Sequence, residues 1–278
     1  MWFNFRESAN LKWYEYKHKI NNDSIYLLFT TRNGGMSSFP YMSLNTATHV
    51  GDDKQTVLNN RNKILEKYGM NNNYCVSANQ THGDIIEYVT KRDCGKGSIY
   101  DPINNADGLI TDEYDVVLMS FYADCVPLYF FDKTKKIIGL AHAGWRGTTL
   151  DIAGKMVDKF CNQYHSNIND LCVAIGPSIC KKCFEIDNAV INEFKKIFNR
   201  KEIDYISSKK LNGRYLLDLW SANKLLLLRK GLTNNQIHVM SLCTYCNEEL
   251  FFSYRREQGQ TGRMASIIFK KVRMVIDD

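Results

Sequence analysis

The chain has 278 residues, 44% of them hydrophobic and 24% charged, and its formal net charge is +6. This composition is typical of a globular protein and excludes a disordered or fibrous chain. Its basic residues are scattered among acidic ones, apart from short clusters such as Lys195-Lys196, so we expect no nucleic-acid partner. The length suits one large domain spanning residues 1–278.

The first thirty residues contain regularly placed charged side chains and lack the apolar segment of a signal peptide. No later apolar run is long enough to span a bilayer. We therefore expect a cytoplasmic protein with no membrane partner. In that reducing compartment the nine cysteines are expected to be core thiols, metal ligands or nucleophiles rather than disulfide partners.

The first half of the chain predicts short strands, sharp turns and one helix. Residues 24–31 form an apolar strand that ends at the glycine-containing turn 32–35. Residues 55–68 place apolar side chains on one helical face and are followed by Gly69. Further strands are predicted at residues 74–80, 85–89, 106–111, 116–123, 126–131 and 137–141.

The second half predicts longer helices between strands. In residues 148–164 apolar positions recur at helical spacing, and Thr148 or Thr149 is the expected N-cap. The N–H groups at that helix start would face the loop 144–147 and provide an anion site. Strands are expected at 171–175, 236–242 and 264–272, and helices at 187–198 and 218–230. Because these elements follow no regular β-α-β order, we predict an α+β fold with mixed sheets flanked by helices.

Three possible metal ligands end three strand-like segments, namely His82, Cys125 and His142. Each stands at a strand-to-turn junction beside glycine or proline, where side chains converge in many enzymes. Two histidines and a cysteine suit zinc and leave its fourth position open, as in catalytic sites. Taken singly, each is also compatible with an ordinary core residue. A third interpretation makes Cys125 a nucleophile with His142 or His82 as its base.

The chain also contains two Cys-x-x-Cys pairs, Cys180 with Cys183 and Cys243 with Cys246. Together they could form a tetrahedral all-cysteine zinc site of the structural kind. The alternative is reduced core thiols, since neither pair has the glycine-rich flanks of a zinc ribbon and the aromatic neighbours indicate packed surroundings. A thioredoxin-like redox role is not expected, because no β-α-β pattern places either pair at a helix start.

Nine motifs, in order over nearly the whole chain, resemble the YfiH/YlmD family of purine nucleoside phosphorylases, also called laccase-domain or polyphenol oxidase proteins. They lie at residues 29–37, 43–45, 49–52, 60–61, 80–83, 106–108, 123–127, 141–147 and 252–256. The resemblance implies a single α+β domain related to a cysteine-deamidase toxin fold. Matched motif by motif, His82, Cys125 and His142 correspond to the family's zinc ligands, the same three residues that the strand ends suggest.

The resemblance implies phosphorolysis of adenosine, inosine and 5'-methylthioadenosine to a free base and ribose 1-phosphate, with adenosine deamination as a side activity. The expected partners are therefore purine nucleosides and phosphate. Zinc would acidify a water for deamination, whereas phosphorolysis needs an anion held beside the anomeric carbon. Arg61 and Arg146 are candidates to bind phosphate, and Asn45 to donate a hydrogen bond to substrate. From its helical spacing alone, Arg61 is a solvated surface charge.

The name laccase implies a copper-dependent polyphenol oxidase as one alternative. Such an enzyme needs a blue-copper centre and further copper ions held mainly by histidine. With six histidines in all, we do not expect a full multicopper set, although the three-ligand site could bind one Cu²⁺ in place of Zn²⁺. Another alternative is a non-catalytic binding protein stabilised by its metal, which zinc removal would unfold rather than merely inactivate. The sequence leaves the oligomeric state open.

Overall fold

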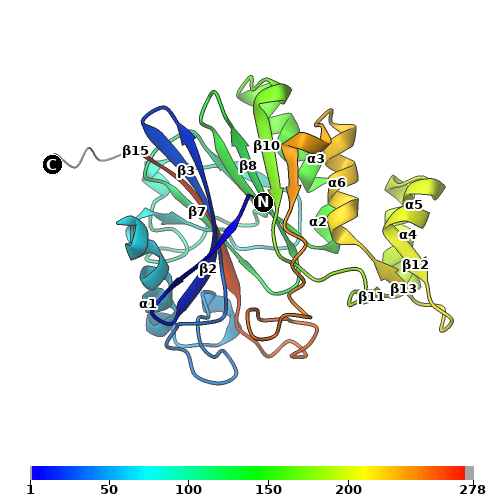
Figure 1. Cartoon of the computed structure of the whole chain (residues 1–278), viewed down its shortest axis with the longest axis horizontal. Coiled ribbons are helices and arrows are strands. Elements are labelled where there is room, and N and C mark those ends of the chain that lie inside the picture. The colour runs from blue at the N-terminus through cyan, green and yellow to red at the C-terminus, as the bar shows by residue number, and fades with distance from the viewer. Residues whose placement is uncertain (1, 273–278) are drawn as a thin grey trace.

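The computed structural model describes residues 2–272 and is built from two six-stranded sheets packed face to face (Figure 1). Helix α1 (Lys54–Leu65) covers the outer face of one sheet. Helices α2 (Trp145–Thr149), α3 (Ile152–Asp158) and α6 (Leu219–Arg229) cover the outer face of the other. Three apolar layers therefore separate four layers of secondary structure. The α+β class with mixed sheets and flanking helices is confirmed.

The first sheet joins strands from both halves of the chain. Its strand order is β1 (Asn4–Ser8), β2 (Leu11–Ile20), β3 (Asp23–Thr30), β15 (Met264–Val272), β7 (Val117–Tyr122) and β4 (Cys75–Val76). Within residues 2–272, the pairing of β4 with β7 is the only parallel one in this sheet. The hairpin β1-β2 was not predicted, since β1 is an exposed edge strand without apolar alternation.

The second sheet carries most of the site described below. Its order is β14 (Ile237–Val239), β10 (Leu171–Ile175), β8 (Val126–Asp132), β9 (Ile138–Ala143), β6 (Gly108–Thr111) and β5 (Ile86–Tyr88). Along β8, Leu128 and Phe130 face the helices while Tyr129 and Phe131 face the first sheet. Burial on both faces explains why these strands appear in the sequence as continuous apolar runs.

The helix predicted over residues 148–164 is divided in the structure. It forms α2 (Trp145–Thr149), α3 (Ile152–Asp158) and a π-helical turn at 159–163. Asp151 interrupts it with a left-handed φ of 58° and caps α3 by accepting a hydrogen bond from the Gly154 N–H. The predicted caps are wrong, because Gly144 is the N-cap of α2 and Thr148 lies within that helix. The anion site expected at Thr148 is therefore not formed there.

A small lobe projects beyond the helical layer (Figure 1). It consists of a three-stranded sheet, with β13 (Tyr215–Leu217) between β11 (Glu185–Ile186) and β12 (Ser207–Lys209), and of helices α4 (Asn188–Ile197) and α5 (Arg200–Ile206). The predicted helices at 187–198 and 218–230 correspond to α4 and to α6 (Leu219–Arg229), whereas α5 was not predicted. Within residues 2–272 no helix has the length and apolar character needed to cross a membrane.

Candidate functional site

The three predicted ligands converge at one end of the second sheet. One ligand atom from each of His82, Cys125 and His142 lies within 4.8 Å of those of the other two. Cys125 directly precedes β8 and His142 lies near the end of β9, and the antiparallel register of these strands brings the two residues together. His82 approaches from the turn before β5, with its ring centroid 4.8 Å from that of His142.

A buried carboxylate, Asp107, holds two of these residues in place. Its Oδ1 accepts a hydrogen bond of 2.8 Å from His142 Nδ1 and one of 3.1 Å from the His82 backbone N–H. Its Oδ2 accepts from the N–H groups of Thr81 and Gly83. These bonds support the left-handed φ of 61° at His82. They also leave His142 Nε2 free, which is how a carboxylate orients a metal-binding histidine.

Asp107 was not assigned a role from the sequence, although the motif 106–108 is one of those that carry the resemblance. Burial is the largest influence on this carboxyl group and opposes its ionisation, but the hydrogen bond and charge of His142 and the backbone N–H donors of Gly83 and Thr81 together outweigh burial and lower the pKa of Asp107. The ionised carboxylate is therefore maintained at neutral pH and continues to accept its four N–H donors. A buried acid beside a predicted histidine ligand is the pattern that indicates such an orienting residue.

The electrostatics of the cluster favour a thiolate. Burial by itself raises the pKa of Cys125, but His142 and His82 outweigh burial and lower it to about 6. Burial lowers the pKa of His142, while the adjacent Cys125 and Asp107 raise it to about 9. A thiolate is the form of cysteine that binds metals and attacks electrophiles.

Space for a bound ion is preserved by Gly144. A Cβ atom at this position would lie 3.0 Å from His82 Cδ2 and 3.1 Å from Cys125 Sγ. The glycine is required for room and not for backbone freedom, because its φ of −67° is open to any residue. Two imidazoles, one thiolate and an unfilled approach fit a zinc ion with an open fourth position.

We therefore expect Gly144→Ala to weaken zinc binding at least tenfold without unfolding the protein, because the added methyl group displaces the ligand side chains. The measurement is competition with a chromogenic chelator, combined with circular dichroism. Gly83→Ala is the matched control, since a Cβ there would make only ordinary contacts of 3.4 Å or more and the backbone N–H is kept. Equal zinc affinity in both variants would contradict the placement of the ion beside Gly144.

The three residues open onto a cavity of about 500 Å³, within the range of small-molecule sites. Its cationic side chains outnumber its acidic ones, and the single carboxylate, Asp124, is already hydrogen-bonded by Thr244 and Ser253. This charge balance suits an anionic ligand. The walls consist of His49, Gln80, His82, Phe121, Ala123, Asp124, Cys125, His142, Trp145, Arg146, Ile179, Phe184, Leu219, Tyr254, Arg255 and Arg263.

The predicted Arg146 lines this cavity with a side chain that is free to bind. Its guanidinium lies 4.4 Å from the ring of Trp145. Among residues 2–272 the structure records no hydrogen bond or ion pair for that guanidinium. Two further arginines, Arg255 and Arg263, were not assigned from the sequence and also reach the cavity. Arg255 is engaged by the Glu185 carbonyl at 2.9 Å, and Arg263 donates to two carbonyls of its own loop.

The predicted Asn45 is fully buried outside the cavity wall. Its Nδ2 donates to the Ala47 carbonyl at 3.0 Å and to Asp52 Oδ2 at 2.9 Å. Its Oδ1 accepts a hydrogen bond of 2.9 Å from the Arg263 backbone N–H. Asn45 therefore contacts the segment that carries Arg263, but its side chain does not line the cavity.

The predicted Arg61 is likewise kept apart from the cavity. The interpretation of Arg61 as a solvated charge is wrong, because it has no exposed surface. Its Nε donates to the Thr46 carbonyl at 2.6 Å and its Nη1 to the Gly97 carbonyl at 2.8 Å. The ring of Phe121, 4.5 Å from the guanidinium, is a wall of the cavity. Arg61 is positioned to join two loops behind that wall.

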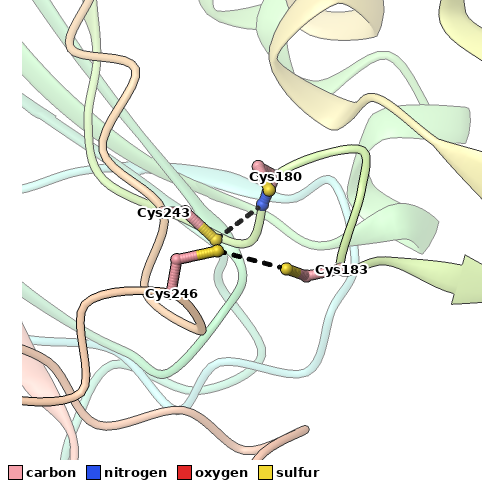
Figure 2. Close-up of side chains that lie close together, drawn as sticks. All are labelled: Cys180, Cys183, Cys243 and Cys246. Carbon is pink, nitrogen blue, oxygen red and sulfur yellow. Dashed lines mark hydrogen bonds between the residues drawn. The ribbon is translucent and has the colours of Figure 1, made fainter.

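The four cysteines of the paired motifs form a second cluster (Figure 2). Their sulfur atoms all lie within 4.8 Å of one another, and Cys183 Sγ lies 3.3 Å from Cys246 Sγ. All four thiols are free, as both interpretations of the paired motifs require; Cys243 is buried, Cys180 and Cys183 are half-buried, and Cys246 is exposed. These residues constitute a possible metal site.

Comparisons with known proteins agree with the motifs. A family model described as multi-copper polyphenol oxidoreductase laccase matches residues 26–271. The chain is 40% identical over 253 residues to the purine nucleoside phosphorylase YlmD of Bacillus subtilis, covering 90% of each protein. Crystal structures of a Bacillus licheniformis hypothetical protein YfiH and of Geobacillus stearothermophilus YlmD are each 39% identical and match with TM-scores of 0.89 and 0.88. Those matches cover 95% and 96% of this chain, respectively, and 98% of each structure. The chain therefore belongs to the YlmD/YfiH laccase-domain family.

Proposed function

We propose that this protein is a zinc-dependent purine nucleoside phosphorylase. The observation that carries the proposal is the cavity itself, in which the cluster of His82, Cys125 and His142 shares a cationic wall with the unpaired guanidinium of Arg146. A phosphorylase must bind phosphate and a nucleoside side by side, and this cavity provides positive charge next to apolar and aromatic surface. The similarity to the purine nucleoside phosphorylase YlmD of Bacillus subtilis supports the same reaction.

Zinc held by His82, Cys125 and His142 would supply positive charge at the floor of the cavity. Arg146 binds the phosphate through its paired N–H donors, a geometry that suits the oxygens of this anion. Because His49 is buried near Arg263, its pKa is lowered to about 4, so this imidazole is neutral at pH 7 and adds no competing charge. The phosphate is thereby directed toward Arg146 and the three-residue cluster.

The nucleoside occupies the apolar side of the cavity. Phe184 and Tyr254 provide aromatic surface for a purine ring. A phosphate oxygen then forms a bond to the ribose anomeric carbon while the bond from that carbon to the purine nitrogen breaks, and the bonding electron pair leaves with the base. The proton of the attacking hydrogen phosphate passes to the released purine nitrogen, so the products are a free purine and ribose 1-phosphate, or 5-methylthioribose 1-phosphate when the substrate is 5'-methylthioadenosine. Adenosine, inosine and 5'-methylthioadenosine are the proposed substrates, and adenosine deamination is the proposed side activity.

A cysteine hydrolase is the second candidate, because one observation favours it. Asp107, His142 and Cys125 form a line of acid, base and thiol like that of a nucleophilic triad. His82 favours the metal site over the triad. Its imidazole is a third possible metal ligand beside the Cys125 sulfur, and a triad of acid, base and thiol has no role for it. A copper oxidase is favoured less, because His18 contacts Tyr16 and His238 stacks on Trp2, away from the cavity.

The proposal is tested by phosphate-dependent release of adenine from adenosine. We expect release by the zinc-loaded protein and a loss of at least 10²-fold in Cys125→Ala, because this variant lacks one of three ligands. Cys172→Ala is the control, since its thiol lies in β10 outside both clusters. If the zinc-loaded native protein releases neither adenine nor hypoxanthine in phosphate, the phosphorylase proposal fails. Rapid alkylation of Cys125 in that same protein would then favour the hydrolase.

A further inference from the structure

The cluster of Cys180, Cys183, Cys243 and Cys246 lies apart from the three residues to which the proposed reaction assigns zinc. None of its four side chains lines the cavity, although Ile179 and Phe184, next to the first pair, do. We propose that these four cysteines bind a second, structural zinc ion that fixes one rim of the cavity. This inference does not depend on which reaction the cavity performs.

The spacing of the sulfur atoms fits a tetrahedral ion. Zinc–sulfur bonds of about 2.3 Å in a tetrahedron place the sulfurs about 3.8 Å apart. The four sulfurs here all lie within 4.8 Å of one another, with 3.3 Å between Cys183 and Cys246 (Figure 2). All four thiols are free, and a disulfide would need its sulfurs about 2.05 Å apart. Side chains already gathered at nearly the ligand spacing need little rearrangement to bind.

Hydrogen bonds and charges around the cluster suit an anionic metal–thiolate centre. The Cys180 backbone N–H donates to Cys243 Sγ at 3.3 Å, the kind of bond that supports a ligating sulfur. Zinc with four thiolates carries a net charge of about −2. Arg256, which is also ion-paired with Glu257, fixes the turn between the second pair, because its guanidinium donates to the Thr244 and Tyr245 carbonyls, both at 2.8 Å.

Exposure separates this cluster from ordinary buried cysteines. A free cysteine usually behaves as a small buried hydrophobe. Here Cys246 is exposed, Cys180 and Cys183 are partly exposed, and only Cys243 is buried. Apolar burial therefore does not explain why four thiols meet at this surface. A soft, all-thiolate set with tetrahedral spacing selects zinc over harder cations such as magnesium or calcium.

The ion would join two segments that are far apart in the chain. A parallel bridge already links Ser178 with Cys243, through hydrogen bonds of Ser178 to Leu242 and of Thr244 to Ser178. Beyond the first pair, the ring of Phe184 lies 5.2 Å from the Arg255 guanidinium. Cross-linking the two cysteine turns would hold Phe184 and Arg255 together where both line the cavity.

The decisive experiment is zinc analysis of the full chain, purified with a reductant and without chelator. We expect about two zinc ions per native chain, one for each cluster. The double variant Cys180→Ser/Cys246→Ser is expected to keep about one, and His82→Ala also about one. Cys161→Ser is the matched control and keeps both, because this partly exposed thiol belongs to neither cluster.

Cobalt substitution identifies the ligands without measuring activity. Because four of the five clustered thiols belong to the all-cysteine group, the double variant should lose most of the thiolate-to-cobalt absorption that Cys161→Ser retains. Limited proteolysis should then cleave the double variant faster at residues 178–184 and 243–256 while its remaining zinc stays bound.

Two results for the native chain would overturn the proposal. One is a single zinc ion per chain, held by His82, Cys125 and His142, and the other is a disulfide among the four cysteines that persists in the protein purified with reductant, found by alkylation and mass analysis. Because the native chain alone decides both points, poor folding of a variant leaves the test intact.

Discussion

Asp107→Asn is expected to lower zinc affinity at the cluster of His82, Cys125 and His142, and the kcat/KM of phosphorolysis, by about 10- to 100-fold. The two carboxylate oxygens of Asp107 accept hydrogen bonds from His142 and from the backbone N–H groups of residues 81–83. An amide offers only one oxygen, so its NH₂ group must face one of these sets of donors. Either His142 loses its orientation or the turn that carries His82 loses its acceptor.

The measurement for Asp107→Asn combines zinc competition with steady-state kinetics. Asp84→Asn is the matched control, because Asp84 lies in the adjoining turn and its carboxylate, among residues 2–272, forms an ion pair only with the exposed Lys155. That variant should retain native zinc affinity and rate. If Asp107→Asn binds zinc as tightly as Asp84→Asn does, Asp107 does not orient the ligands.

Arg61→Met is expected to lower the free energy of unfolding by about 2–4 kcal/mol while leaving the KM for phosphate unchanged. Removing the guanidinium leaves the Thr46 and Gly97 carbonyls and the Ser98 hydroxyl without their buried partner. The decrease in the free energy of unfolding is limited because the buried site itself disfavours a charge. Burial lowers the pKa of Arg61 to about 10. The methionine side chain keeps most of the apolar volume against Phe121.

The contrast with Arg146→Met makes the prediction for Arg61 specific. Arg146 is exposed and unpaired, so its replacement should change stability by less than about 0.5 kcal/mol and raise the KM for phosphate at least tenfold. Urea unfolding and phosphate titration measure the two effects. A larger rise in the KM for phosphate with Arg61→Met than with Arg146→Met would restore the sequence-based role of Arg61 and remove that of Arg146.

Several elements of the fold could be predicted because their signals are local. The apolar runs of β8, β9 and β15 and the helical periodicity of α1 and α6 appear in the sequence within a few residues of their observed bounds. Features with weak local signals were missed. Strand β1 at the sheet edge has no apolar alternation to mark the β1-β2 hairpin, and the break at Asp151 depends on a single left-handed residue within an otherwise helical pattern.

The sequence by itself determined the chemistry available to the site, because a residue type at a strand end limits what it can bind. His82, Cys125 and His142 were chosen in this way, Arg146 was chosen because the resemblance implies a phosphate substrate, and the structure brings all four to one cavity. Residue type also suggested the all-cysteine cluster, but did not distinguish it from core thiols.

Only the tertiary structure decided which polar residues touch one another. The pairing of β8 with β9, and of β6 with both β5 and β9, places Asp107 between His82 and His142. Packing of α1 against the first sheet buries Arg61, and the bridge at Ser178 joins the two cysteine turns. Strand register and helix packing arise from many weak contacts between distant segments, so no local pattern specifies which side chains meet.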